Sequence, residues 1–191
     1  MHSRRYILQV LSIGAMSGVS GCAGAKQKQA DSVESVHSIR DSVIYGCLKM
    51  MVSDVLVRPK IVEKTALNTT RVSTPDSGSV FVLVKITLEN TCEHQIPYPK
   101  QVSHIGLRSP AGPTVPVFPI EFTADGQSYP TYENQVEHEG VNGRIPPNTQ
   151  IEGWRVFEAP DGFRDTKNTV TIKYGTSEKR LRTFYWELPK L

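Results

Sequence analysis

The chain has 191 residues, enough for one domain with a tail. Hydrophobic residues make up 38% of it, which can form a core and excludes a chain that is disordered throughout. The 22 lysines and arginines barely exceed the 19 acidic residues, so a net charge of +3 gives no support for binding nucleic acid.

The first 21 residues have the pattern of an export signal. Arg4 and Arg5 precede a mildly apolar stretch over 7–19, which is too short and too polar to span a bilayer. The stretch ends in Val-Ser-Gly-Cys at 19–22, which resembles the lipobox of prokaryotic lipoproteins. The resemblance implies that a signal peptide over 1–21 is removed and that Cys22 is lipidated. Because this modification adds more than one acyl chain, we expect stable attachment to the cell membrane or outer membrane, on its extracytoplasmic side.

The export route stays open. Residues 3–8, Ser-Arg-Arg-Tyr-Ile-Leu, resemble a twin-arginine motif, with Ile7 where Phe is common and Gln9 where Lys is common. General secretion signals also carry paired arginines, so that route fits equally. Without Arg4 and Arg5 the remaining side chains carry only +1, so most of the basic charge belongs to the targeting signal.

Residues 22–42 are predicted to form a flexible tether behind the lipidated cysteine. They are polar and contain no aromatic side chain, although Val33, Val36 and Ile39 recur at a spacing that would also suit a short helix. A flexible segment of this length would span about 25 Å. The domain is therefore expected over 43–191, and a chain of that size can bury a single core.

Alternating side chains predict a series of short strands. The clearest covers 80–89, where aliphatic residues at even positions share one face. Further strands are predicted over 48–57, 104–108, 114–122, 151–158, 169–174 and 181–188, and the prolines in 114–122 place that strand at an edge or a bulge. Trp154 and Phe157 both look buried but point to opposite faces, which favours a bulge there. Short strands separated by turn residues predict an all-β protein with a β-sandwich fold.

Two segments carry a more specific pattern. Residues 81–91 form an apolar strand that ends in Glu-Asn-Thr, and 145–160 combine a Pro-Pro-Asn turn, a Gly-Trp strand and Phe-Glu-Ala-Pro. Together they resemble the telokin-like, immunoprotective-extracellular-antigen-like domains of prokaryotic lipoproteins, over roughly residues 50–175. The resemblance implies an immunoglobulin-like β-sandwich with no assigned catalytic residues. Asn148 stands where that family commonly has Gly, and Asn tolerates the left-handed backbone of a turn.

Two cysteines remain after Cys22. Outside the cytosol, Cys47 and Cys92 could form one disulfide, or both could be buried free thiols. If Cys92 were free, Cys92-Glu93-His94 would offer ligands to a soft metal. No Cys-x-x-Cys pair occurs, so the sequence indicates neither a zinc site nor thioredoxin-like chemistry.

Catalytic motifs are absent from the mature sequence. It contains no nucleophile elbow, no His-Glu-x-x-His motif and no glycine-rich phosphate loop. We therefore expect no enzymatic activity, no cofactor and no resident metal. The alternative is a metal-handling or accessory-enzyme lipoprotein, which would require His94, His104 and His138 to converge in space. Residues 137–139, Glu-His-Glu, form the most site-like cluster, but a solvated polar loop is the plainer interpretation.

Charge is segregated along the domain. Residues 109–143 carry −5 and residues 164–190 carry +4. Exposed tyrosines among acidic residues suit recognition, so we expect a candidate partner-binding loop made of Glu121, Asp125, Tyr129, Tyr132 and Glu133. A solvated loop remains the alternative. The sequence thus favours a membrane-anchored, non-catalytic binding or structural module with a protein or envelope partner.

Overall fold

Strands dominate the part of the chain that the computed structural model describes, which is residues 35–64, 69–99, 104–138, 143–175 and 180–191. The predicted signal peptide, Cys22 and the tether up to residue 34 lie outside the described residues. In the described residues, no helix has the length and apolar character needed to cross a membrane.

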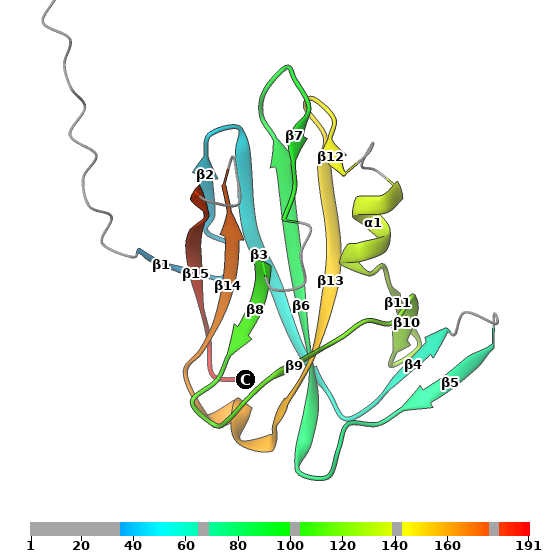
Figure 1. The fold of residues 1–191 in the computed structure, drawn as a ribbon. Coiled ribbons are helices and arrows are strands. Elements are labelled where there is room, and N and C mark those ends of the chain that lie inside the picture. The colour runs from blue at the N-terminus through cyan, green and yellow to red at the C-terminus, as the bar shows by residue number, and fades with distance from the viewer. Residues whose placement is uncertain (1–34, 65–68, 100–103, 139–142, 176–179) are drawn as a thin grey trace, which may run out of the picture. The chain divides into compact units, whose positions relative to one another are not determined.

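A five-stranded antiparallel sheet runs through the middle of the fold (Figure 1). Its three long strands are β3 (Leu48–Arg58), β6 (Ser79–Asn90) and β13 (Gln150–Pro160). The short strands β2 (Ser42–Tyr45) and β9 (Val115–Val117) form its edges. The strands predicted over 48–57, 80–89 and 151–158 are confirmed, because alternation of side chains marked each of them correctly.

A four-stranded sheet covers one face of the central sheet. Its order is β1 (Val36–Ser38), β15 (Arg182–Leu188), β14 (Asn168–Tyr174) and β8 (Ile105–Arg108). The even-numbered aliphatic residues of β6 pack against Val170, Ile172 and the fully buried Trp186 of this sheet. The strands predicted over 104–108, 169–174 and 181–188 are confirmed, and the two sheets form the predicted all-β sandwich.

A second core lies on the opposite face of the central sheet. There β10 (Glu121–Ala124), β11 (Gln127–Tyr129), β4 (Ile61–Lys64) and β5 (Thr70–Ser73) form another sheet. The buried residues of this core include Phe81 and Leu83 of β6 and Trp154 of β13. Trp154 is therefore buried on one face of β13, while Phe157 is buried in the first core on the other face.

The bulge predicted at Trp154 is wrong. β13 pairs with β6 in unbroken register from Gln150 to Pro160, and both faces of β13 are covered instead. The central sheet has a register shift in β3, between Val52 and Asp54. The strand predicted over 114–122 is wrong as one element, because the segment around Pro119 separates β9 from β10. Its predicted place at an edge is confirmed for β9, which contains Pro116 and forms one edge of the central sheet.

Short elements close the ends of the sheets. A two-stranded ladder joins β7 (Ile96–Pro97) to β12 (Arg144–Ile145), and η2 (Asp161–Asp165) follows β13. The helix α1 (Tyr132–His138) packs on β13. It comes so close that a Cβ at Gly153 would lie 2.5 Å from the Cα of Tyr132, which explains why glycine precedes Trp154.

The predicted tether ends earlier than residue 42. β1 pairs in parallel with β15, and the indole Nε1 of Trp186 donates to the carbonyl of Asp41 at 3.0 Å. The backbone N–H of Arg40 donates to Val52 at 2.8 Å, and Ile39 packs against the first core. The boundary at Val43 is therefore wrong, because these backbone groups find partners in distant strands that composition alone does not reveal.

Candidate functional site

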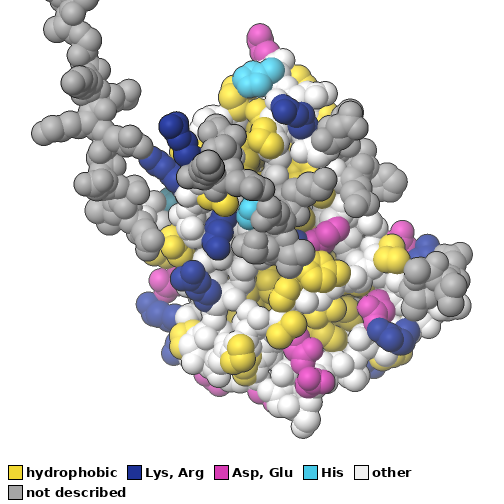
Figure 2. Space-filling model, viewed as in Figure 1, with side chains coloured by type: hydrophobic (Ala, Val, Ile, Leu, Met, Phe, Trp, Pro, Cys, Tyr) yellow, Lys and Arg dark blue, Asp and Glu magenta, His cyan; other side chains and the backbone are white. Residues whose placement is uncertain are grey.

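A cleft of about 600 Å³ opens at the end of the sandwich where the turn after β2, the ladder of β7 and β12, and the end of β14 meet. Figure 2 shows hydrophobic, histidine and basic side chains, with an acidic side chain at the tip, at the end of the molecule where β7 and β12 lie. The residues that line the cleft are Tyr45, Gly46, Cys47, His94, Gln95, Ile96, Pro97, Arg144 and Tyr174.

Aromatic rings form one wall of the cleft. The rings of Tyr45 and Tyr174 meet edge to face with their centroids 6.2 Å apart, and Phe184 lies 5.6 Å from Tyr45. The guanidinium carbon of Arg182 lies 5.2 Å from the centre of the Tyr45 ring. Burial, with a smaller contribution from Tyr45, raises the pKa of Tyr174 above its usual value, so its phenol is neutral at physiological pH. This wall offers stacking surface and a phenol rather than a charge.

Arg144, His94 and Gln95 contribute the rest of the polar lining. His94 and Arg144 are exposed, and Nη1 of Arg144 donates to the carbonyl of Gln95 at 3.4 Å. No carboxylate lines the cleft among the residues that the structure describes. A cleft with guanidinium and imidazole groups and without carboxylates suits a ligand that carries an anionic group.

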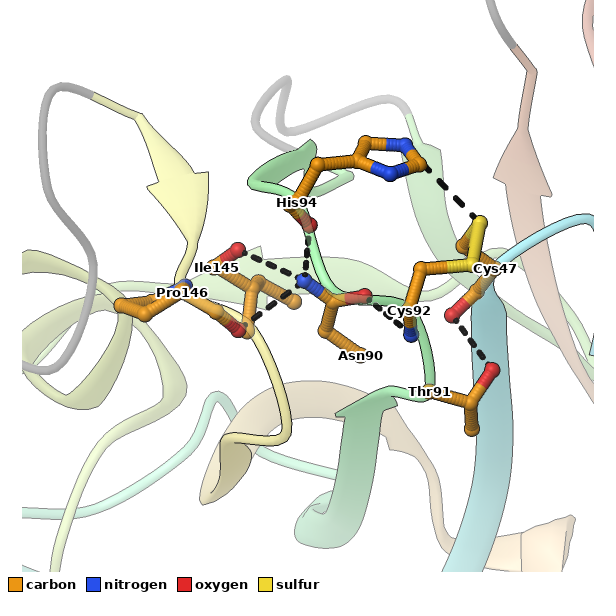
Figure 3. Close-up of a disulfide and its surroundings, with 7 residues drawn as sticks. All are labelled: Cys47, Asn90, Thr91, Cys92, His94, Ile145 and Pro146. Carbon is orange, nitrogen blue, oxygen red and sulfur yellow. Dashed lines mark hydrogen bonds between the residues drawn. A yellow bond between two sulfur atoms is a disulfide. The ribbon is translucent and has the colours of Figure 1, made fainter.

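A disulfide between Cys47 and Cys92 lies beside the cleft (Figure 3). It connects the turn before β3 to the turn after β6, with the two Cα atoms 5.4 Å apart. Of the two possibilities that the sequence left open, the structure therefore contains the bridge. The Nε2 atom of His94 lies 4.0 Å from Sγ of Cys47.

Asn90 holds this end of the fold together. Its fully buried amide Nδ2 donates to three carbonyls, those of His94 at 2.7 Å, Ile145 at 3.0 Å and Pro146 at 2.9 Å. Its Oδ1 accepts from the backbone N–H of Cys92 at 3.0 Å. The sequence pattern Glu-Asn-Thr indicated only a strand end. In the structure, Asn90 holds the backbones of Cys92 and His94 and also the turn at 145–146.

The tyrosines of the predicted partner-binding loop are buried, so that prediction is wrong. Tyr129 is 6% exposed, stacks on Phe122 with centroids 5.5 Å apart, and meets Trp154 edge to face at 5.1 Å. Tyr132 is 2% exposed, and its hydroxyl donates to the carbonyl of Pro99 at 3.1 Å. Burial raises the pKa of Tyr132 well above its usual value, and the neighbouring Glu133 adds to this effect. Both rings belong to the interior, because a third sheet and α1 cover this face.

The acidic residues of that predicted loop are paired with bases. Glu121 forms an ion pair with Lys64 at 3.2 Å, and Asp125 forms one with Arg58 at 2.7 Å. These bases come from β3 and β4, so bases from outside the acidic stretch balance the charges of Glu121 and Asp125.

Glu133 pairs with Arg155, which is 2% exposed in β13. Burial lowers the pKa of Arg155 from its usual value, and Glu133 opposes that shift. The ring of Phe118 lies 4.8 Å from the guanidinium carbon of Arg155. The ion pair between Glu133 and Arg155 joins α1 to β13, so its role is structural.

Of the three histidines of the metal-handling alternative, His94 and His104 do not share a group of close metal-ligating atoms in the described part of the chain. There, the group of close metal-ligating atoms consists of Cys47, Cys92 and His94, all within 4.8 Å of one another, and does not include His104. His138 is the last residue of α1, and its side chain and that of Glu137 lie outside the described ones, as does the whole of Glu139. The sequence offered Cys92 either to Cys47 as a disulfide partner or to a metal together with His94, but it did not combine the three residues in one group.

Comparisons with known proteins identify the fold alone. No protein-family model matches the sequence. No curated protein sequence matches it either. The YjhA protein of Bacillus subtilis is structurally similar with 17% identity and a TM-score of 0.51, covering 81% of this chain and 100% of that chain. A functionally unknown protein from Listeria monocytogenes EGD-e has 9% identity and a TM-score of 0.51, covering 82% of this chain and 85% of that one. The chain thus has the fold of bacterial β-sandwich proteins of unknown function.

Proposed function

We propose that this chain is an exported, lipid-anchored protein whose immunoglobulin-like, telokin-like β-sandwich is a non-catalytic binding module. The lipobox-like residues before Cys22 support the anchor, and the disulfide supports an extracytoplasmic location in the cell membrane or outer membrane. The chain uses no cofactor and does not bind nucleic acid.

The cleft between Tyr45, His94, Arg144 and Tyr174 is the binding site in this proposal. The observation that carries it is the combination of an aromatic wall with exposed basic groups and no lining carboxylate among the described residues. The partner is a protein or an envelope component that presents an anionic group to Arg144 and His94. If the cleft binds no partner, the sandwich has a purely structural role in the cell envelope.

Substitution of Cys22 tests the anchor. Cys22→Ala removes the thiol that would receive the lipid, so the protein should move from the membrane fraction to the soluble fraction of fractionated cells. Ser20→Ala, which keeps the cysteine and a small residue before it, should leave the protein in the membrane fraction. Membrane association that survives Cys22→Ala contradicts the lipid anchor.

Site-specific cross-linking in intact cells tests the cleft. A photoreactive amino acid at the exposed Gln95 should give an adduct, whereas the same probe at the exposed Asp161, away from the cleft, should not. Arg144→Ala should reduce the adduct, and the matched surface variant Arg164→Ala should not. Equal adducts at both probe positions, or an adduct that is insensitive to Arg144→Ala, would overturn the assignment of the cleft.

A further inference from the structure

We propose that, once the Cys47–Cys92 disulfide is reduced, the two cysteine thiolates and the His94 imidazole bind a thiophilic cation such as Zn²⁺ or Cu⁺. The proposal goes beyond the binding of a partner in the cleft, because it requires only residues of this chain. It gives the protein two states, an oxidised state that lacks the two thiolates and a reduced state that can hold a metal.

The three donor atoms lie close to the spacing of a small metal site, and reduction of the disulfide allows the two sulfurs to separate. Sγ of Cys47, Sγ of Cys92 and a ring nitrogen of His94 lie within 4.8 Å of one another, and Figure 3 shows the three residues together. A tetrahedral zinc ion, about 2.3 Å from sulfur and about 2.0 Å from nitrogen, holds its donors roughly 3.5–3.8 Å apart. After reduction, rotation of the cysteine side chains separates the sulfurs to that distance, and a small movement brings the His94 imidazole, now 4.0 Å from Sγ of Cys47, into range.

The three residues are held in place by bonds that do not depend on the disulfide. The backbone N–H and the hydroxyl of Thr91 both donate to the carbonyl of Cys47, at 2.9 and 3.1 Å. The buried Asn90 side chain accepts from the N–H of Cys92 and donates to the carbonyl of His94. Breaking the sulfur–sulfur bond therefore leaves the backbones of all three ligands where they were, and a preorganised site loses less conformational entropy on binding.

The site is accessible to a reductant and to an ion. His94 is exposed, the two cysteines are half-buried, and His94 and Cys47 line the open cleft. A small dithiol transfers two electrons and two protons to the disulfide and itself becomes a disulfide, which leaves two thiols on this chain. Metal binding then releases the two thiol protons to solvent as both sulfurs become ligands.

The donor set selects the class of metal. Two thiolates and one imidazole suit Zn²⁺ or Cu⁺, whereas Mg²⁺ and Ca²⁺ require oxygen ligands. Three protein ligands leave a fourth position of a tetrahedral ion open toward solvent, as in metal sites that exchange a water or a ligand. In the oxidised chain both sulfurs are in the disulfide and only the imidazole of His94 remains as a ligand, so the oxidised chain should bind the metal much more weakly than the reduced chain.

The test uses Co²⁺ as a spectroscopic substitute for Zn²⁺ on the purified full-length chain. The chain is reduced with dithiothreitol, separated from it without oxygen, and titrated with Co²⁺. The reduced chain should show thiolate-to-cobalt charge-transfer absorption that saturates at one metal per chain, and added Zn²⁺ should displace it. The oxidised chain should show no such absorption.

Variants separate the site from adventitious binding. His94→Gln keeps both cysteines and should weaken cobalt binding by more than about tenfold, since even an outer partner of a metal ligand contributes that much. The control variant His37→Gln changes a histidine of β1, remote from the disulfide, and should bind cobalt as tightly as the unaltered chain. The double variant Cys47→Ser, Cys92→Ser should lose the charge-transfer band, and circular dichroism establishes that it folds.

The proposal is overturned if the reduced chain shows no charge-transfer band, or if His94→Gln binds cobalt as tightly as the unaltered chain. Either result leaves the cross-linking test of the cleft unaffected, because that test is performed on the oxidised protein in intact cells.

Discussion

Replacing Asn90 with alanine tests whether one buried amide holds the cleft end of the fold together. The amide nitrogen has two hydrogens for the carbonyls of His94, Ile145 and Pro146, and its oxygen accepts from Cys92. The variant therefore loses the equivalent of three hydrogen bonds. At about 1 kcal/mol each, the free energy of unfolding should fall by about 3 kcal/mol. For a domain of this size that corresponds to a decrease in Tm of roughly 6–12 °C.

Urea and thermal unfolding of the oxidised full-length chain, followed by circular dichroism, measure this loss. Gln150→Ala is the matched control, because Gln150 is exposed on the neighbouring strand β13. Its effect should remain within about 0.5 kcal/mol. A loss of less than about 1 kcal/mol in Asn90→Ala would refute the reasoning, since one ordinary hydrogen bond already contributes that much.

Asn90→Asp sharpens the test, because it keeps the shape and exchanges the donor for an acceptor. Its carboxylate would face the carbonyl oxygens of His94, Ile145 and Pro146 without a hydrogen to share. The variant should be at least as unstable as Asn90→Ala at neutral pH, and it should regain stability in acid, where the carboxyl group is protonated and donates one bond. Stability equal to that of the unaltered chain at neutral pH would count against the clamp.

Two further predictions concern Gly153 and Tyr132, which meet where α1 packs on β13. Gly153→Ala places a Cβ 2.5 Å from the backbone Cα of Tyr132, so the free energy of unfolding measured in urea should fall by roughly 1–3 kcal/mol. The control Gly162→Ala, whose Cβ would lie 3.5 Å from the Cβ of Ala111, should leave stability unchanged. Equal effects of the two variants would refute the close approach of α1 to β13. Tyr132→Phe loses the bond to Pro99, about 1 kcal/mol at neutral pH. Because burial raises the pKa of Tyr132, the unfolded chain loses its phenol proton at a lower pH than the folded chain does, and stability falls above about pH 10. Urea unfolding across pH should therefore show a shallower alkaline decline in Tyr132→Phe, and an unchanged slope would contradict the assigned cause.

The strands could be read from the sequence where one face is apolar. In β6 the even positions from Val80 to Leu88 are buried as their alternation predicted, and β14 and β15 follow the same rule. Alternation succeeds because successive side chains of a strand point to opposite faces. It does not say how many sheets cover the strand. The burial of both Trp154 and Phe157 therefore suggested a bulge, whereas a second core around Phe81, Leu83 and Trp154 covers the other face of the sheet.

The candidate site depends on contacts between segments that are far apart in the chain. Cys47 and Cys92 are separated by 45 residues, and the cleft combines them with Arg144 and Tyr174. The sequence identified the cysteine pair and the nearby His94 as candidates. It could not place Asn90 at the centre, because an Asn after a strand is also the residue of an ordinary turn.

The predicted recognition loop failed for a related reason. Composition shows that acidic residues and tyrosines are close together between 109 and 143, but not which groups they meet. The structure brings Lys64 to Glu121 and Arg58 to Asp125, and it covers Tyr129 with Phe122 and Trp154.

The sequence by itself determined the export-signal pattern, the all-β class and the strand faces, because each of these depends on residues that are neighbours along the chain. Only the tertiary structure decided the second core, the burial of the tyrosines and the grouping of Cys47, Cys92 and His94 beside a basic cleft. These depend on which strands pair across long loops, and that choice is made by the packing of whole sheets rather than by any local pattern.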